Sequence, residues 1–193
     1  MHHDNKHSLT KRKNSLSIRV VTTMDQLMHA YAVRAICFME EHLTPANVAC
    51  DGNDLQSTHF VAYDGEEPIG AMRVRWFNDF AKLERSAFRK EYRDMRNLRF
   101  AAEFVFEHVA RKGYSCIVTH ARPEYARLWE RVLGFEVASG KPPLRLAGED
   151  YEYIELVKTL LVPDNAITIE TDAIVMARTE GQWDFAALSE SRA

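Results

Sequence analysis

The stretch that decides the fold runs from residue 81 to residue 98: Ala81-Lys82-Leu83-Glu84-Arg85-Ser86-Ala87-Phe88-Arg89-Lys90-Glu91-Tyr92-Arg93-Asp94-Met95-Arg96-Asn97-Leu98. It predicts a strand, an arginine-rich turn and the start of a helix. Unpaired backbone N–H groups and the helix dipole at such a start favour a phosphate. Glu84 and Ser86 share one face of the strand, because side chains alternate with a period of two. These features suggest chemistry on a phosphate-bearing donor, and a solvated charged strand stays open as the alternative.

The composition indicates an ordinary globular protein. Of the 193 residues 46% are hydrophobic, and the formal net charge is −3. A negative balance does not favour nucleic acid or a membrane surface as a partner. The three cysteines match neither a zinc spacing nor a disulfide framework, so we expect a reducing cytoplasm and no metal site. No run approaches the roughly 18 apolar residues of a membrane span, and Met1 to Ser17 lacks the apolar core of a secretory signal.

Three regions divide the chain. Residues 1–16 are polar and basic and predict a disordered arm. Residues 17–160 predict one domain. Residues 161–193 predict an extension with a strand at 166–169 and a docked helical turn at 183–188.

Within 17–160, hydrophobic periodicity predicts alternating strands and helices. A strand at 17–21 precedes a helix capped by Thr23, which carries Arg34 and Phe38 on or beside its apolar stripe. A polar loop at 44–56, with Asp51 and Asp54, leads to a strand hairpin at 58–63 and 68–76. The key strand follows, and then a helix with Asn97 as its N-cap and Gly113 at its end. A strand at 116–120, a helix that starts at Pro123 and a strand pair at 135–138 and 151–160 complete an α/β (α+β) domain on a mixed sheet.

Four stretches in this order resemble the GNAT superfamily of N-acyltransferases. The helix segment Val33-Arg34-Ala35-Ile36-Cys37-Phe38-Met39-Glu40-Glu41-His42 resembles the first-helix signature Arg-x-x-x-Phe-x-x-Glu-Glu, with the acidic pair one residue nearer the phenylalanine. Asp51-Gly52-Asn53-Asp54 with the following strand, Leu83 to Arg93, and Leu133-Gly134-Phe135 are the other three. The resemblance implies a GNAT-like, mixed, mostly antiparallel central sheet with splayed fourth and fifth strands and flanking helices.

What the resemblance implies for function is direct transfer of an acyl group from a pantetheine thioester to an amine. The donor is acyl-CoA or acyl carrier protein, with no tightly bound cofactor, and the acceptor is a small amine or amino acid. Ser86, Ala87 and Phe88 would contact the pantetheine arm. The usual cofactor loop is rich in glycine, but this chain has none there, so the resemblance leaves Arg93, Arg96, Asn97 and Leu98 to hold the phosphate.

The nearest subgroup in the pattern is that of autoinducer synthases and N-acyl amino acid synthases, which take acyl groups from acyl carrier protein. This likeness implies five substrate-binding residues: Arg34, Phe38, Asp51, Asp54 and Arg73. His120 of the fifth strand is a sixth candidate. Ala87 replaces the subgroup's arginine, which argues against lactone synthesis. Trp129 and Glu130 stand where the superfamily usually has a tyrosine acid.

Catalysis is assigned to Glu84 and Ser86. Glu84 is the candidate general base, because an amine nucleophile must lose a proton, and a surface ion pair is its alternative. Ser86 is expected to bond the arm or the thioester carbonyl, since no Ser–His–Asp set is apparent. Arg34 could instead serve a structural ion pair, and His120 could be an ordinary strand histidine. A GNAT-like binding module without catalysis is the rival function, and a homodimer stays open.

Overall fold

The computed structural model describes residues 16–145 and 151–184, so all but Leu16 of the expected arm lies outside the described residues. The strands are β1 Leu16–Val20, β2 Thr58–Asp64, β3 Glu67–Trp76, β4 Ala81–Phe88, β5 Cys116–Ala121, β6 Glu136–Val137, β7 Leu144–Arg145 and β8 Glu152–Thr159. The helices are α1 Met24–Arg34, the π-helix η1 Ala35–Glu40, α2 Ala46–Ala49, the 3₁₀ turns η2 Gly52–Gln56 and η3 Lys90–Tyr92, α3 Met95–Arg111, α4 Pro123–Leu133 and α5 Ala173–Met176.

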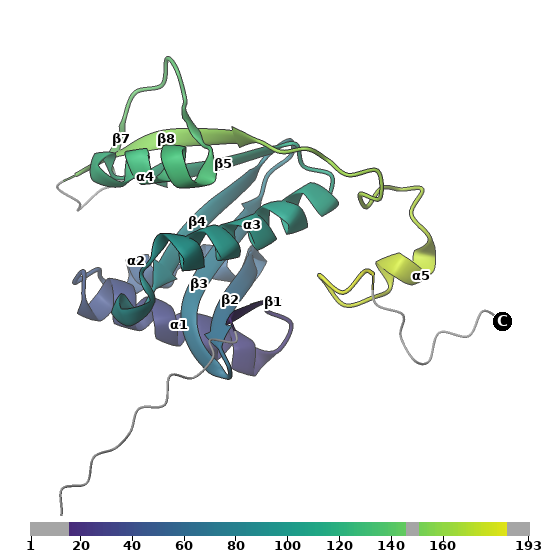
Figure 1. Ribbon diagram of the computed structural model, residues 1–193, viewed down its shortest axis with the longest axis horizontal. Helices are drawn as coiled ribbons and strands as arrows, with labels where there is room; N and C mark the ends of the chain where they lie inside the picture. Colours follow the sequence, from purple (N-terminus) through teal and green to yellow (C-terminus); the bar gives the residue numbers. More distant parts are fainter. Residues whose placement is uncertain (1–15, 146–150, 185–193) are drawn as a thin grey trace, which may run out of the picture.

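The strands form one sheet in the order β1-β2-β3-β4-β5-β8-β6, with β7 beside β8 (Figure 1). Every neighbouring pair is antiparallel except β4 and β5, which run parallel. A right-handed crossover through a helix is the usual link between parallel neighbours, and α3 supplies the helix here. The predicted mixed, mostly antiparallel sheet with flanking helices is therefore confirmed.

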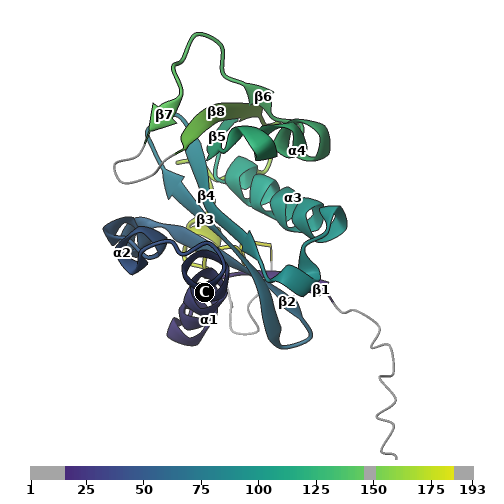
Figure 2. The same ribbon diagram turned by 90° about the vertical axis from the view of Figure 1, so that its left-hand side faces the viewer.

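Helices cover both faces of the sheet. Figure 2 shows α1 and α2 on one side and α3 and α4 on the other. The apolar stripe of α3 through Ala101, Val105 and Val109 is buried in the larger core, together with residues of α4. A smaller core joins α1 to the opposite face, where Ala30 and Val33 pack against β2, β3 and β4. The central strands β2, β3 and β4 are thus buried on both faces of the sheet.

The two parallel strands separate soon after they meet. Their pairing covers only Ala81 with Ile117 and Lys82 with Val118. One residue further along, the Thr119 hydroxyl donates to the Leu83 carbonyl at 2.9 Å, and no further ladder bonds join the strands. The predicted divergence at their C-terminal ends is confirmed, and it leaves backbone groups of β4 without a strand neighbour.

Two local predictions were wrong. The N-cap of α3 is Asp94, not Asn97, because the Asp94 carboxylate accepts the Asn97 N–H at 2.7 Å and so begins the helix earlier. The expected polar loop at 44–56 holds the short helix α2 and the turn η2. An Asp51–Asp54 capping box stabilises η2. The Asp51 carboxylate accepts the Asn53 N–H, and the Asp54 carboxylate accepts the Asp51 N–H.

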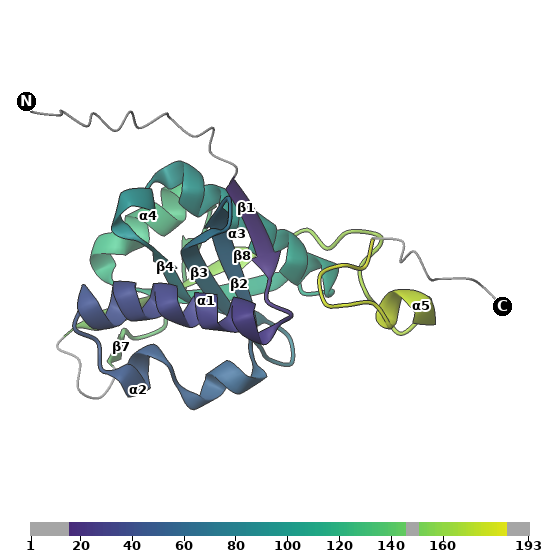
Figure 3. The same ribbon diagram turned by 90° about the horizontal axis from the view of Figure 1, so that it is seen from below.

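The C-terminal segment leaves the end of β8, carries α5 at the right of Figure 1 and Figure 3, and continues past α5 to Asp184. The strand expected at 166–169 is absent from this described segment, where the Ile167 N–H instead bonds the Arg111 carbonyl. Trp183 is buried and stacks on His108 with ring centroids 5.0 Å apart. Most of the expected turn at 183–188 lies outside the described residues. Within the described part of the chain, no helix has the length and hydropathy of a membrane span.

Candidate active site

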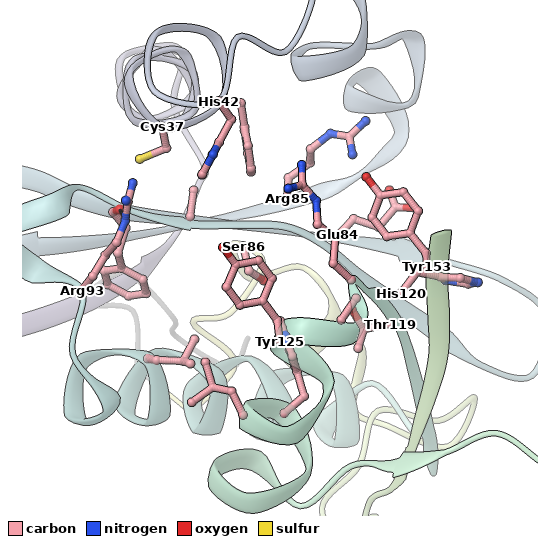
Figure 4. A pocket seen from close by; sticks show the side chains of 18 of the residues that line it. Cys37, His42, Glu84, Arg85, Ser86, Arg93, Thr119, His120, Tyr125 and Tyr153 are labelled. Atoms are coloured by element: carbon pink, nitrogen blue, oxygen red, sulfur yellow. Dashed lines mark hydrogen bonds between the residues drawn. The ribbon is translucent and has the colours of Figure 1, made fainter. Parts of the chain in front are cut away.

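A cavity of about 690 Å³ lies where β4 and β5 separate. Figure 4 shows side chains of β4, β5 and α4 around the cavity, with Cys37 and His42 at the top of the view and Tyr125 below them. Its wall is mostly apolar between α3 and α4, where Met95, Leu98 and Trp129 contribute. A cavity of this volume falls within the range of small-molecule sites.

A β-bulge shapes the β4 wall. Ala87 pairs with Ala71 and Glu84 pairs with Arg73, so two residues of β4 oppose the single residue Met72 of β3. Arg85 in the bulge adopts a positive φ of 53°, which is costly for a residue with a side chain. Its guanidinium holds this conformation by donating to the Val48 carbonyl at 2.7 Å and to Asp51 at 2.9 Å. Strain kept at a cavity wall is typical of a functional site.

Three buried polar atoms of the cavity lining have no hydrogen-bond partner among the residues that the structure describes. They are Arg85 Nε, Ser86 Oγ and His120 Nδ1. Buried polar groups are nearly always paired. These three atoms are themselves buried in the wall, so a polar ligand or water can pair with them only after a small movement of the lining.

Glu84 lines the cavity but is held in ion pairs. Arg73 Nη2 lies 2.5 Å and Lys82 Nζ 2.8 Å from its carboxylate oxygens. Burial alone would raise the pKa of Glu84, but the hydrogen bonds from Lys82 and Arg73 hold that pKa below its usual value. A carboxylate stabilised in this way accepts a proton poorly.

His120 lies on β5 and lines the same cavity. Its Nε2 is 3.4 Å from Glu155 Oε2, and its Nδ1 is the unpaired atom noted above. Burial lowers the pKa of His120 below its ordinary value, and the charge on Lys82 lowers it further. The imidazole is therefore neutral near pH 7, the state in which one ring nitrogen carries a lone pair that can accept a proton.

Of the other residues predicted to bind the substrate, Phe38 lines the cavity. The remaining four do not line it and instead form a buried or half-buried charge cluster behind β4: Arg34, Asp51, Asp54 and Arg73. Arg34 and Arg73 each expose 1% of their surface, and both donate to Asp54 at 2.7 Å. Hydrogen bonds from both arginines outweigh burial and lower the pKa of Asp54. Every member has an ionic partner within the cluster.

The residues predicted to contact the donor divide into two groups. Ser86, Ala87 and Phe88 line the cavity, as do Arg93 and Leu98 of the turn and helix start. Arg96 and Asn97 do not line it: Arg96 is exposed, and the Asn97 side chain is buried and donates to the Tyr92 carbonyl at 2.9 Å. The donor-binding role of all these residues stays a prediction.

Sequence reasoning missed Tyr125, which lies on α4 and lines the cavity. Figure 4 shows its ring among the side chains around the cavity, which also include Ser86. In the sequence, Trp129 and Glu130 stand at the usual tyrosine position, and neither side chain is a phenol. Tyr125 precedes Trp129 by four residues, and residues at this spacing share one helix face. The four-residue spacing was therefore the sequence signal that could have identified Tyr125 as a residue on the same face as Trp129.

Residues 25–135 match the model of the Acetyltransferase (GNAT) family, and the chain therefore belongs to that family. The predicted class of enzyme, a GNAT-type acyltransferase, is confirmed at this level.

Among curated proteins, the chain is similar to "Uncharacterized N-acetyltransferase YjcF" of Bacillus subtilis, with 41% identity over 69 residues. That match covers 36% of this chain and about half of the relative, 49%. A crystal structure named "putative N-acetyltransferase from Lactobacillus plantarum" is 25% identical, with a TM-score of 0.64 over 77% of this chain and 100% of that one. A GNAT acetyltransferase from Elizabethkingia anophelis, solved with acetyl-CoA bound, is 14% identical and shares the fold, with a TM-score of 0.56 over 77% of this chain and 100% of that one.

Proposed function

We propose that this protein is an N-acyltransferase that moves an acyl group from a pantetheine thioester to a small amine or amino acid. The observation that carries the proposal is the 690 Å³ cavity at the point where β4 and β5 stop pairing. An extended arm can bond the free backbone groups of β4 there, as an added strand would. The family match supports thioester chemistry. Acyl-CoA and acyl carrier protein are the candidate donors.

The reaction needs one proton removed and one supplied. The amine nitrogen attacks the thioester carbonyl carbon, the new C–N bond forms, and the C–S bond then breaks. Both His120 and Tyr125 line the cavity. In this proposal His120 accepts the proton that the amine loses, and Tyr125 donates one to the departing sulfur. Ser86 Oγ can donate a hydrogen bond to the thioester carbonyl as negative charge develops on that oxygen. The products are an amide and a free thiol.

The sequence predicted Glu84 as the general base, and that assignment is the rival to His120. The ion pairs of Glu84 with Lys82 and Arg73 favour a positioning role instead. In that role Glu84 holds the charge of Lys82 where it lowers the pKa of His120. The autoinducer-synthase subgroup, a homodimer and a cytoplasmic location stay hypotheses.

The first test measures thiol release from acetyl-CoA, with amino acids, polyamines and small amines offered in turn as acceptors. We expect release that depends on the amine and saturates with it. Binding of the thioester without release, with every acceptor class, would instead favour the rival function of an inert binding module.

Tyr125→Phe is expected to lower kcat about tenfold, the loss of a modest general acid. Thiolates leave more easily than alkoxides, so the effect falls at the low end of acid catalysis. The loss should shrink with a thioester whose thiol is more acidic, such as a nitrothiophenyl ester. An equal loss for both leaving groups would assign Tyr125 to packing instead.

A further inference from the structure

The N-terminus of α3 meets the mouth of the cavity, where Asp94, Met95 and Leu98 contribute to the lining. A helix start of this kind would ordinarily attract an anion, because its first N–H groups are unpaired and the helix dipole is positive there. In this protein the position is already occupied. Asp94 Oδ1 accepts the N–H of Asn97 at 2.7 Å.

The Asp94 carboxylate removes one donor and adds a negative charge at the same place. A diphosphate brought to this helix start would compete with that carboxylate for the N–H of Asn97. It would also meet repulsion from a like charge at close range. Residues 89–98 contain no glycine, so a Cβ atom at every position limits how closely phosphate oxygens can approach the backbone.

The basic side chains of the turn are largely engaged with the protein itself. Arg93 donates from Nε to the Phe88 carbonyl at 2.6 Å and forms an ion pair with Glu41. Arg89 pairs with Glu67 at the edge of β3. Arg96 is exposed and does not line the cavity.

The other end of the cavity has the opposite character. The unpaired polar atoms Arg85 Nε, Ser86 Oγ and His120 Nδ1 gather where β4 and β5 separate, next to the free backbone of β4. The groups that lack partners therefore lie along the path of an arm and a thioester.

We infer that the donor is recognised by its acyl-pantetheine arm alone, and that the described part of the cleft provides no site for the diphosphate or nucleotide of coenzyme A. The inference rests on the proposed function. It makes a pantetheine thioester the donor class, whether the arm is free, part of coenzyme A or attached to a carrier protein. It also differs from the expectation that Arg93 and Arg96 hold the phosphate.

Equilibrium binding tests this without any acceptor. We expect coenzyme A and pantetheine to bind the full chain with dissociation constants within about threefold of each other, and adenosine 3′,5′-diphosphate at 1 mM not to displace either. Coenzyme A binding about 100-fold tighter than pantetheine, or displacement by the nucleotide, would overturn the inference. Because binding is measured, the result is independent of whether acyl transfer occurs. Failure of the proposed function would appear separately, as the absence of thiol release.

Asp94→Asn gives the matched test of the charge. Asparagine caps a helix as well as aspartate does, so the fold is kept while the negative charge is removed. At low ionic strength we expect the affinity for coenzyme A to rise about fivefold relative to that for pantetheine. Glu91→Gln removes an exposed carboxylate from the same turn, outside the cavity lining, and should leave the ratio unchanged. An unchanged ratio for Asp94→Asn, or an equal rise for both variants, would contradict the role given to Asp94.

Discussion

His120→Gln should lower kcat about 100-fold, the usual loss of a general base, with little change in the KM of the donor. The imidazole lies in the cavity lining and has the neutral state that proton removal needs. Because burial and Lys82 lower the pKa of His120 below 6.5, the neutral base persists as the pH falls through 6.5. The acidic limb of the kcat profile should therefore lie below pH 6.5 in the wild-type protein and be absent from the variant.

Two comparisons make the result specific. His29→Gln changes a histidine of α1 that bonds the Tyr63 hydroxyl and does not line the cavity, and it should leave kcat unchanged. Glu84→Gln carries the rival assignment. Should Glu84→Gln lose 100-fold while His120→Gln loses nothing, the base is Glu84, as the sequence alone predicted, and the assignment to His120 is wrong.

Arg73→Leu should cost about 3–5 kcal/mol of unfolding free energy, the usual cost of removing one partner from a buried ion pair. Arg73 exposes 1% of its surface and donates to Asp51, Asp54 and Glu84 at once. Without it, three carboxylates lose part of their compensation while they stay buried or half-buried. Denaturant unfolding followed by circular dichroism measures the effect.

Arg75→Leu is the control for that measurement. Arg75 lies two residues along the same strand, is partly exposed and comes only within 3.8 Å of Glu84. Its loss should cost less than about 1 kcal/mol, as for most exposed pairs. If Arg73→Leu leaves stability unchanged and instead raises the KM of the acceptor sharply, Arg73 binds substrate, which is what the sequence pattern suggested.

The sequence predicted the fold well because its strongest signals were local. The hairpin, the stripe of α3 and the Gly134 stop after α4 each follow from periodicity or from a backbone preference. Gly134, for example, adopts the left-handed conformation that ends α4. The Asn97 cap was misplaced by three residues because two good capping residues stand close together, and only the three-dimensional hydrogen bond selects Asp94.

The site was harder to predict, since it depends on contacts between distant segments. The sequence identified Arg34 as a charge that could need a structural partner, and Asp51, Asp54 and Arg73 as substrate-binding residues, but it could not show that all four would pair with one another behind β4. Tyr125 and His120 face one cavity only because β4 and β5 separate. The bulge at Arg85 leaves no trace in the hydrophobic pattern.

The most direct test of the central claim is mass spectrometry of the acceptor after reaction with a thioester, with free thiol counted in the same sample. The account predicts an amide on the amine and one thiol released for each amide formed, with no acyl group left on the protein. Thiol release without an N-acyl product, or an acyl group retained on the protein, would contradict direct transfer to an amine.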